Sequence, residues 1–124
     1  MNVTLRSDNK AIRKALAHVG AGRFADAERL FRSVLSSNPD DAAANHGLGL
    51  ISLRRGRPHD ALKLLTAALQ ANPAEGQYWF SFAEALLLTG ASSDARNILD
   101  RAASRGLNGP EAMELRARIG HAEA

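Results

Sequence analysis

Apolar residues recur along most of this chain at the spacing of an amphipathic helix. Between residues 24 and 37 they stand at Ala27, Leu30, Phe31, Val34 and Leu35, which fall on one face of a helix. Glycine and proline interrupt such stretches at short intervals, and each interruption predicts a helix end. The pattern predicts seven helices, over about residues 8–20, 24–37, 42–54, 58–71, 76–88, 92–105 and 110–119.

The landmarks of this pattern repeat at a fixed interval. Gly22, Gly56 and Gly90 are equally spaced, since 56 − 22 = 90 − 56 = 34. The same step relates three further sets, which are Ala27, Ala61 and Ala95, then Asp26, Asp60 and Asp94, then Leu30, Leu64 and Ile98. A period of this length is typical of helix-turn-helix solenoids, whose repeats bury their apolar faces only by stacking on one another. The sequence therefore predicts an all-α solenoid.

Residues with known preferences for helix ends stand where the helices are expected to stop and start. Asn38-Pro39 and Asn72-Pro73 close two of the hairpins, because proline cannot continue a helix and biases its predecessor away from helical geometry. Either Asp40 or Asp41 is expected to cap the third helix, and Ser92 the sixth.

The residues at several of these positions resemble the tetratricopeptide repeat, whose signature combines Trp, Leu-Gly and Tyr in a first helix with Ala, Phe and Pro in a second. Leu48-Gly49 and Trp79 match the first helix, whereas Phe31, the three periodic alanines and the two prolines match the second. The resemblance implies a right-handed α-solenoid. Its parts are a flexible segment over 1–7, three repeats over 8–41, 42–75 and 76–109, and a capping helix and tail over 110–124.

The last predicted helix has two interpretations. As a cap it would expose charged residues and offer Met113 and Leu115 to the core, since arrays of this type need a polar terminal face for solubility. Alternatively, it is the first half of a further repeat.

Composition and charge narrow the function classes only slightly. The formal charge of +3 is spread over interspersed acidic and basic residues and does not indicate nucleic-acid binding. The absence of cysteine excludes disulfides and thiolate metal sites. No stretch approaches the roughly 20 apolar residues of a membrane span, and the N-terminus lacks the apolar core of a secretory signal. We expect a cytoplasmic protein without membrane insertion, and the abundance of arginine and alanine suggests a bacterial one.

Residues with catalytic or metal-binding chemistry are sparse. His18, His46, His59 and His121 are scattered, and none has an acid or a second histidine at ligand spacing. Arg54-Arg55-Gly56-Arg57 is the densest basic cluster, but it has no interleaved aromatic residues and fits a solvated turn. We therefore expect no catalytic residue, no metal site and no cofactor in this chain.

In tetratricopeptide proteins the first helix of each repeat lines a concave groove that receives a peptide or a partner helix. Carried over by position, the resemblance implies a partner-binding set of Asn9, Ile12, Arg13, Leu16, His46, Leu50, Leu53, Gln77, Phe80, Ser81, Glu84 and Leu87. Two of its rows, Ile12-His46-Phe80 and Leu16-Leu50-Glu84, are mostly apolar and suit an amphipathic helix or a hydrophobic segment. Alternatively, four of its members, Ile12, Leu16, Leu50 and Leu53, simply pack between neighbouring helices.

These features predict a non-enzymatic protein-interaction module, a scaffold or adaptor, whose partner is a protein or peptide and not a nucleic acid. Two alternatives stay open. The chain could be the N-terminal recruiting segment of a larger enzyme such as a glycosyltransferase, or a small dedicated chaperone for an aggregation-prone secreted subunit. A homo-oligomer is a further option, because the exposed face of a terminal repeat can pair with its symmetry mate.

Overall fold

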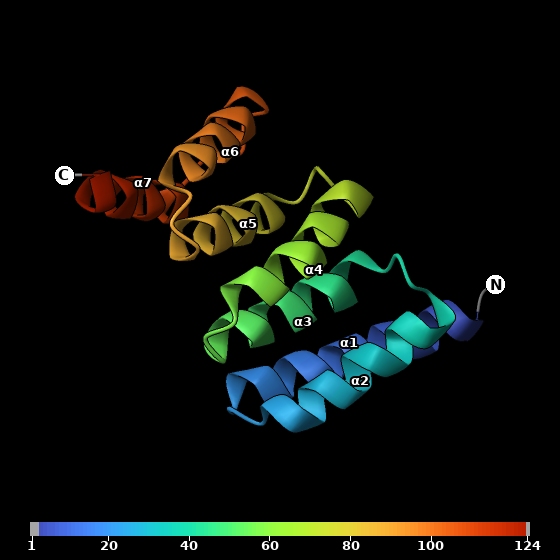
Figure 1. Ribbon diagram of the computed structural model, residues 1–124. Coiled ribbons are helices and arrows are strands. Elements are labelled where there is room, and N and C mark those ends of the chain that lie inside the picture. The colour runs from blue at the N-terminus through green and yellow to red at the C-terminus, as the bar shows by residue number, and fades with distance from the viewer. Residues whose placement is uncertain (1–2, 124) are drawn as a thin grey trace.

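The computed structural model describes residues 3–123 and contains seven α-helices and no strand over that range. The helices are α1 (Val3–Gly20), α2 (Phe24–Ser37), α3 (Ala42–Arg54), α4 (Pro58–Ala71), α5 (Gly76–Leu88), α6 (Ser92–Ser104) and α7 (Pro110–Glu123). They form helix hairpins that follow one another along the molecule, with the two chain ends on opposite sides (Figure 1). The predicted all-α solenoid is confirmed.

The first helix begins earlier than the sequence predicts. It was expected from Asp8, after a flexible segment, whereas α1 begins at Val3. Later copies carry Pro39 and Pro73 before the first helix of the next repeat, but the equivalent position, 39 − 34 = 5, holds leucine. Without a proline, nothing stops the helix from extending N-terminal of Asp8. Met1 and Asn2, the rest of the expected flexible segment, lie outside the described residues.

Glycine closes the turn inside each hairpin. Gly22, Gly56 and Gly90 have positive φ angles of 77°, 72° and 88°, a region that residues with a side chain rarely adopt. After the last of these, the backbone N–H of Ala91 donates to the carbonyl of Leu86 at 2.8 Å. This geometry puts Ala91 at the N-cap of α6, with no side-chain bond, and the predicted Ser92 cap is wrong.

The links between hairpins are held by side chains at equivalent positions. Asp41 accepts a hydrogen bond from the backbone N–H of Ala44 at 2.9 Å, which confirms the predicted cap of α3. Asn45 Nδ2 donates to the carbonyl of Pro39 at 3.1 Å, and one repeat later Trp79 Nε1 donates to the carbonyl of Pro73 at 2.8 Å. Two different side chains thus bond equivalent loop carbonyls in successive repeats.

The helices form two layers. In the described range α1, α3, α5 and α7 contact one another in succession, whereas α2, α4 and α6 contact only odd-numbered helices. Helices on the inside of a curved stack are closer together than those outside. The first helices of the repeats therefore form the inner, concave layer.

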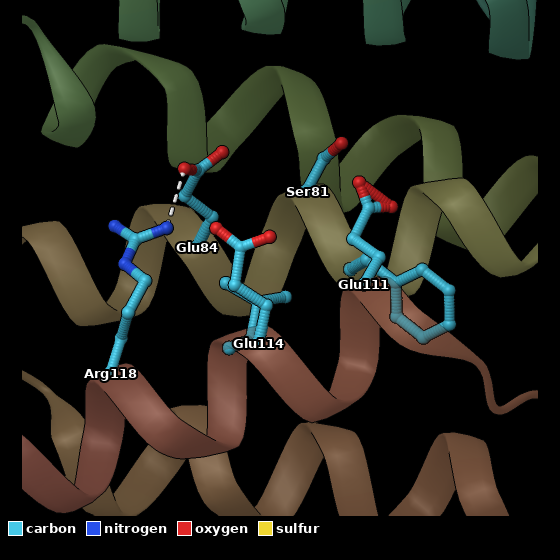
Figure 2. Close-up of a pocket in the computed structure, with 7 residues that line it drawn as sticks. Ser81, Glu84, Glu111, Glu114 and Arg118 are labelled. Atoms are coloured by element: carbon cyan, nitrogen blue, oxygen red, sulfur yellow. Dashed lines mark hydrogen bonds and ion pairs between the residues drawn. The ribbon is translucent and has the colours of Figure 1, made fainter.

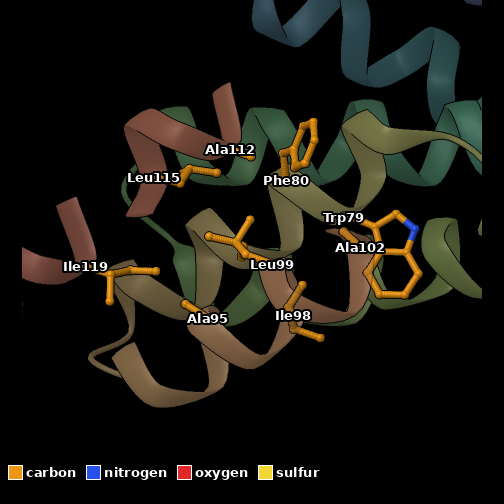
Figure 3. Packing of buried hydrophobic residues seen from close by; sticks show 10 residues of the cluster. Trp79, Phe80, Ala95, Ile98, Leu99, Ala102, Ala112, Leu115 and Ile119 are labelled. Carbon is orange, nitrogen blue, oxygen red and sulfur yellow. The ribbon is translucent and has the colours of Figure 1, made fainter. Parts of the chain in front are cut away.

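The core consists of local clusters rather than one centre. One surrounds Phe31 between α1, α2 and α3, a small one surrounds Leu65, and the third surrounds Trp79 between α5, α6 and α7. Figure 3 shows this third cluster, to which α7 contributes Ala112, Leu115 and Ile119. Each cluster belongs to neighbouring helices, as expected for a solenoid.

The last helix has the placement of a first helix. It begins one full period after the start of α5, since 110 − 76 = 34, and continues to Glu123, beyond the predicted end at Ile119. Leu115 is buried as predicted, but Met113 is 71% exposed, so its predicted place in the core is wrong. Met113 stands one period after Trp79, which is buried beside α6. This position, in line with the first helices, agrees with both interpretations of the last helix.

Candidate functional site

The inner face carries the residues that the sequence assigns to partner binding, and their exposure differs. Leu16 is 50% exposed, and Asn9, Arg13 and Gln77 are exposed as well. Phe80 and Ser81 are buried. The remaining members are partly buried, which are Ile12, His46, Leu50, Leu53, Glu84 and Leu87.

Some of the aliphatic members belong to the core. Ile12 packs against the cluster around Phe31, Leu53 against the small cluster around Leu65, and Leu87 against the cluster around Trp79. The packing interpretation therefore holds for Ile12 and Leu53, and Leu87 packs in the same way. Leu16 and Leu50 are not part of these clusters in the described range and offer the accessible apolar surface of the face.

A histidine connects α3 to α5 in the middle of the face. The Nε2 atom of His46 lies 2.8 Å from Ser81 Oγ, and its ring centroid lies 4.7 Å from that of Tyr78. Burial lowers the pKa of His46 to about 4, and the nearby charge of Glu75 opposes this only in part. The imidazole is therefore neutral at physiological pH.

The His46–Ser81 pair does not have the arrangement of a nucleophile and its base. Ser81 is only 7% exposed, so a substrate has little access to its hydroxyl. No carboxylate forms a hydrogen bond or ion pair with the His46 ring anywhere in residues 3–123, whereas an activated serine needs a base that a third group orients. The pair acts as a polar link between two helices.

The C-terminal end of the inner face is acidic. A small cavity of about 80 Å³ between α5 and α7 is lined by Phe80, Ser81, Glu84, Glu111, Glu114, Leu115 and Arg118. Figure 2 shows Glu84 paired with Arg118, with the other two carboxylates beside them. The Glu84–Arg118 pair is 3.0 Å long. With three carboxylates and one guanidinium, this end of the face favours a cationic group.

The sequence prediction included Phe80, Ser81 and Glu84 but missed the residues of α7. The 34-residue period indicates two of them. Arg118 follows Glu84 by one period, since 118 − 84 = 34, and Glu114 follows Phe80, since 114 − 80 = 34. Extending the period into the last helix would have found them. The cavity is far smaller than the roughly 300–1,000 Å³ of a cofactor or drug-sized site and fits part of one side chain.

Residues 3–123 contain no group of three or more His, Cys, Asp or Glu side chains that could hold a metal ion. His18 instead accepts a hydrogen bond from Arg23 Nε at 2.8 Å. None of the helices in this range combines the length and the apolar character needed to cross a membrane.

Comparison with protein families gives two overlapping matches. One tetratricopeptide repeat model matches residues 12–74, and a second matches residues 52–119. Each spans at least half of the chain.

Curated relatives are much longer than this chain. Cellulose synthase operon protein C of Komagataeibacter xylinus is 31% identical over 81 residues, which are 65% of this chain and 6% of that protein. Human trafficking protein particle complex subunit 12 is 36% identical over 59 residues, which are 48% of this chain and 8% of that protein. The matched region therefore spans only a small part of these relatives.

Solved structures share the fold at low sequence identity. A Thermobaculum terrenum O-GlcNAc transferase mutant has a TM-score of 0.77 at 24% identity, covering 94% of this chain and 21% of that one. The Yersinia enterocolitica type III secretion chaperone SycD, in complex with a peptide of the translocator YopD, has a TM-score of 0.75 at 24% identity. The match covers 92% of this chain and 87% of SycD.

Proposed function

The chain belongs to the tetratricopeptide repeat family, and we propose that it is a non-enzymatic scaffold or adaptor that binds a peptide or an amphipathic helix on its inner face. Tetratricopeptide repeats are protein-interaction modules, so a protein or peptide partner follows from the family. The binding mode is the proposal. A helix or extended peptide in such a groove presents apolar side chains to apolar surface and keeps polar ones at the rim.

The observation that carries the proposal is the division of the inner face. Leu16, which is 50% exposed, and the partly buried Leu50 supply apolar surface on α1 and α3. The acidic cavity beside Glu84 follows on α5 and α7. A partner with apolar residues toward one end and a basic residue toward the other complements this arrangement in both hydrophobicity and charge.

The test is selection from a random peptide library displayed on phage, followed by affinity measurement of the selected peptides. We expect enrichment of peptides with spaced apolar residues and a basic residue. Leu50→Arg places a charge in the middle of the face and should weaken their binding by about tenfold or more, because a buried unpaired charge costs more than about 1.4 kcal/mol.

Met113→Arg is the matched control, since it adds the same charge at a residue that is 71% exposed on α7. It should bind the selected peptides as the unchanged protein does. If the Leu50→Arg and Met113→Arg variants bind the selected peptides with the same affinity, the binding site does not lie on the inner face. A selection that enriches no peptide would contradict the proposal itself.

A second candidate function is a recruiting segment within a larger protein. The observation that favours it is the small share of the curated relatives, 6% and 8%, that this chain spans. An antibody against the chain distinguishes the two on an immunoblot of source cells. A band near 13.2 kDa supports a free adaptor, and only a much larger band supports the recruiting segment.

A dedicated chaperone is a third candidate, favoured by the near full-length overlap with SycD, which was solved with a translocator peptide. Co-purification with one abundant small subunit, protected from aggregation by this chain, would support it over a general adaptor. The bacterial origin and the cytoplasmic location expected from the sequence also remain proposals. Fractionating the source cells before the immunoblot would test the location.

A further inference from the structure

A second hollow lies away from the inner face, between α4, α5 and α6. Its volume is about 270 Å³, and its lining includes Leu69, Phe82, Ile98, Trp79, Arg101 and Arg105. We call it the Trp79 hollow. Its apolar walls come from three helices, and its charged rim comes from α6 and the residue that follows it. Figure 3 shows Trp79 at one end of the third cluster, with Ile98 and Ala102 nearby.

The two arginines of the Trp79 hollow share one aromatic ring. The Cζ atoms of Arg101 and Arg105 lie 5.8 and 5.3 Å from the centroid of Trp79, within the range of a cation–π contact. Both side chains are exposed, and among the described side chains of residues 8–123 neither forms a hydrogen bond or an ion pair. The nearest acidic residue in sequence, Asp100, is paired with Arg116 at 2.8 Å. Two exposed guanidinium groups therefore lie at the rim of an apolar hollow, where a ligand can reach them.

The repeat does not require the two arginines. One period upstream of Trp79, Arg101 and Arg105 the second repeat holds Asn45, Ala67 and Ala71. Asn45 donates to the carbonyl of Pro39, which is equivalent to the Pro73 carbonyl that Trp79 bonds in the third repeat. The second repeat thus folds without an arginine at these two places. Trp79 itself matches the repeat signature, so only the two arginines over its ring need a separate explanation.

We propose that the Trp79 hollow binds an acidic segment of a partner protein. A large apolar side chain of the segment enters between Leu69, Phe82 and Ile98, and flanking aspartates or glutamates pair with Arg101 and Arg105. Arginine is well suited to this task because its planar fork binds carboxylates through two hydrogen bonds. Desolvation by the neighbouring apolar walls strengthens such a pair.

A protein segment fits this hollow better than a nucleic acid does. Trp79 is only 3% exposed and lies under the two guanidinium groups, so it cannot stack on a base. Two cations at the end of one helix are also few for a phosphate backbone, whose binding uses many basic contacts. The proposed site also differs from the inner face. The Trp79 hollow lies away from that face, and its proposed ligand is acidic, whereas the inner face favours a basic residue.

Trp79 is the single tryptophan of the chain, so its fluorescence reports on this site directly. The probe is a terminally blocked peptide with one leucine flanked on each side by two glutamates. We expect a saturable change in Trp79 emission, with affinity that falls as salt rises from about 0.05 to about 0.3 M. The Arg101→Gln/Arg105→Gln variant should bind about tenfold or more weakly, because losing two charge-assisted contacts costs at least about 1.4 kcal/mol.

The Arg54→Gln/Arg57→Gln variant removes the same charge from two exposed residues, the last of α3 and the one before α4, and should bind as the unchanged protein does. Equal weakening by both double variants would overturn the proposal in favour of general charge attraction. A probe with glutamine in place of glutamate should not bind, and equal binding would exclude carboxylate recognition. Tighter binding of single-stranded DNA than of the acidic peptide would overturn the protein-segment assignment. Circular dichroism of each variant is the control for correct folding.

Discussion

At the scale of single residues, His46 makes the folded state sensitive to pH. Its pKa lies at about 4, well below the unfolded value of 6.5, because burial disfavours the charged imidazole. Between these two values the unfolded chain binds more protons than the folded one, so the free energy of unfolding decreases as pH falls. The stability that His46 contributes as a neutral ring is fully present above the unfolded pKa of 6.5. It is lost progressively as the pH falls toward the folded pKa of about 4.

We predict that this loss amounts to on the order of 3 kcal/mol between about pH 7 and pH 4. Urea unfolding at a series of pH values measures it. His46→Gln keeps a polar group near Ser81 but cannot titrate, so its stability should change much less over the same pH range. Parallel curves for the two proteins would show that carboxylates, and not His46, cause the pH dependence.

Residue identities at repeat positions were predictable, whereas the contacts between repeats were not. The period put His46 in one row with Phe80, but its hydrogen-bond partner is Ser81, one residue further along. The offset depends on how each hairpin is rotated against the next, and a sequence period carries no such angle. For the same reason the sequence did not reveal that two arginines lie over Trp79, since this depends on side-chain direction across the α5–α6 contact.

At the scale of helices, the close approach of α3 to α2 depends on Gly47. A Cβ atom at this position would overlap the ring of Phe31, and Phe31 is completely buried. A ring enclosed on all sides cannot move aside easily, because protein interiors are close-packed. Gly47 is therefore required by packing and not by backbone conformation.

We predict that Gly47→Ala lowers the free energy of unfolding by about 1–3 kcal/mol, the usual range for overpacking, even though alanine favours a helix. Gly120→Ala in α7 is the control, because nothing lies within 4 Å of its added Cβ. It should be neutral or stabilise by up to about 1 kcal/mol. Chemical denaturation of both variants measures the difference, and a Gly47→Ala variant as stable as the control would mean that α2 and α3 are less closely packed than described.

Helix boundaries followed the sequence wherever glycine or proline marks an end. The bounds of α2, α3, α4 and α5 agree with the prediction. The end of α6 differs by one residue, since the helix ends at Ser104 and not at the predicted Arg105. The larger differences at α1 and α7 occur where such a residue is missing or ineffective. Leu5 does not stop α1, and Gly120 does not stop α7, since a single glycine inside a helix costs only about 1 kcal/mol. Signals at the ends of a helix therefore decide its bounds more reliably than the fading of its apolar pattern.

At the scale of the whole molecule, stability is distributed along the solenoid. Within the described part of the chain, the clusters around Phe31 and Trp79 share no residue, and helix contacts connect only neighbouring hairpins. In such an array the stability of each repeat depends mainly on its neighbours. The two halves of the inner face, apolar on α1 and α3 and acidic on α5 and α7, are thus supported by separate parts of the core.

We predict that Leu115→Ala destabilises the C-terminal half selectively. Leu115 is 4% exposed in the Trp79 cluster, so its truncation should cost about 2–5 kcal/mol. Amide hydrogen exchange should show lost protection in α5, α6 and α7, with α1 and α2 nearly unchanged. Met113→Ala truncates a neighbouring exposed residue and should change stability by no more than about 0.5 kcal/mol. Equal loss of protection in all helices would show one cooperative unit, and the acidic and apolar halves of the inner face could then not open independently.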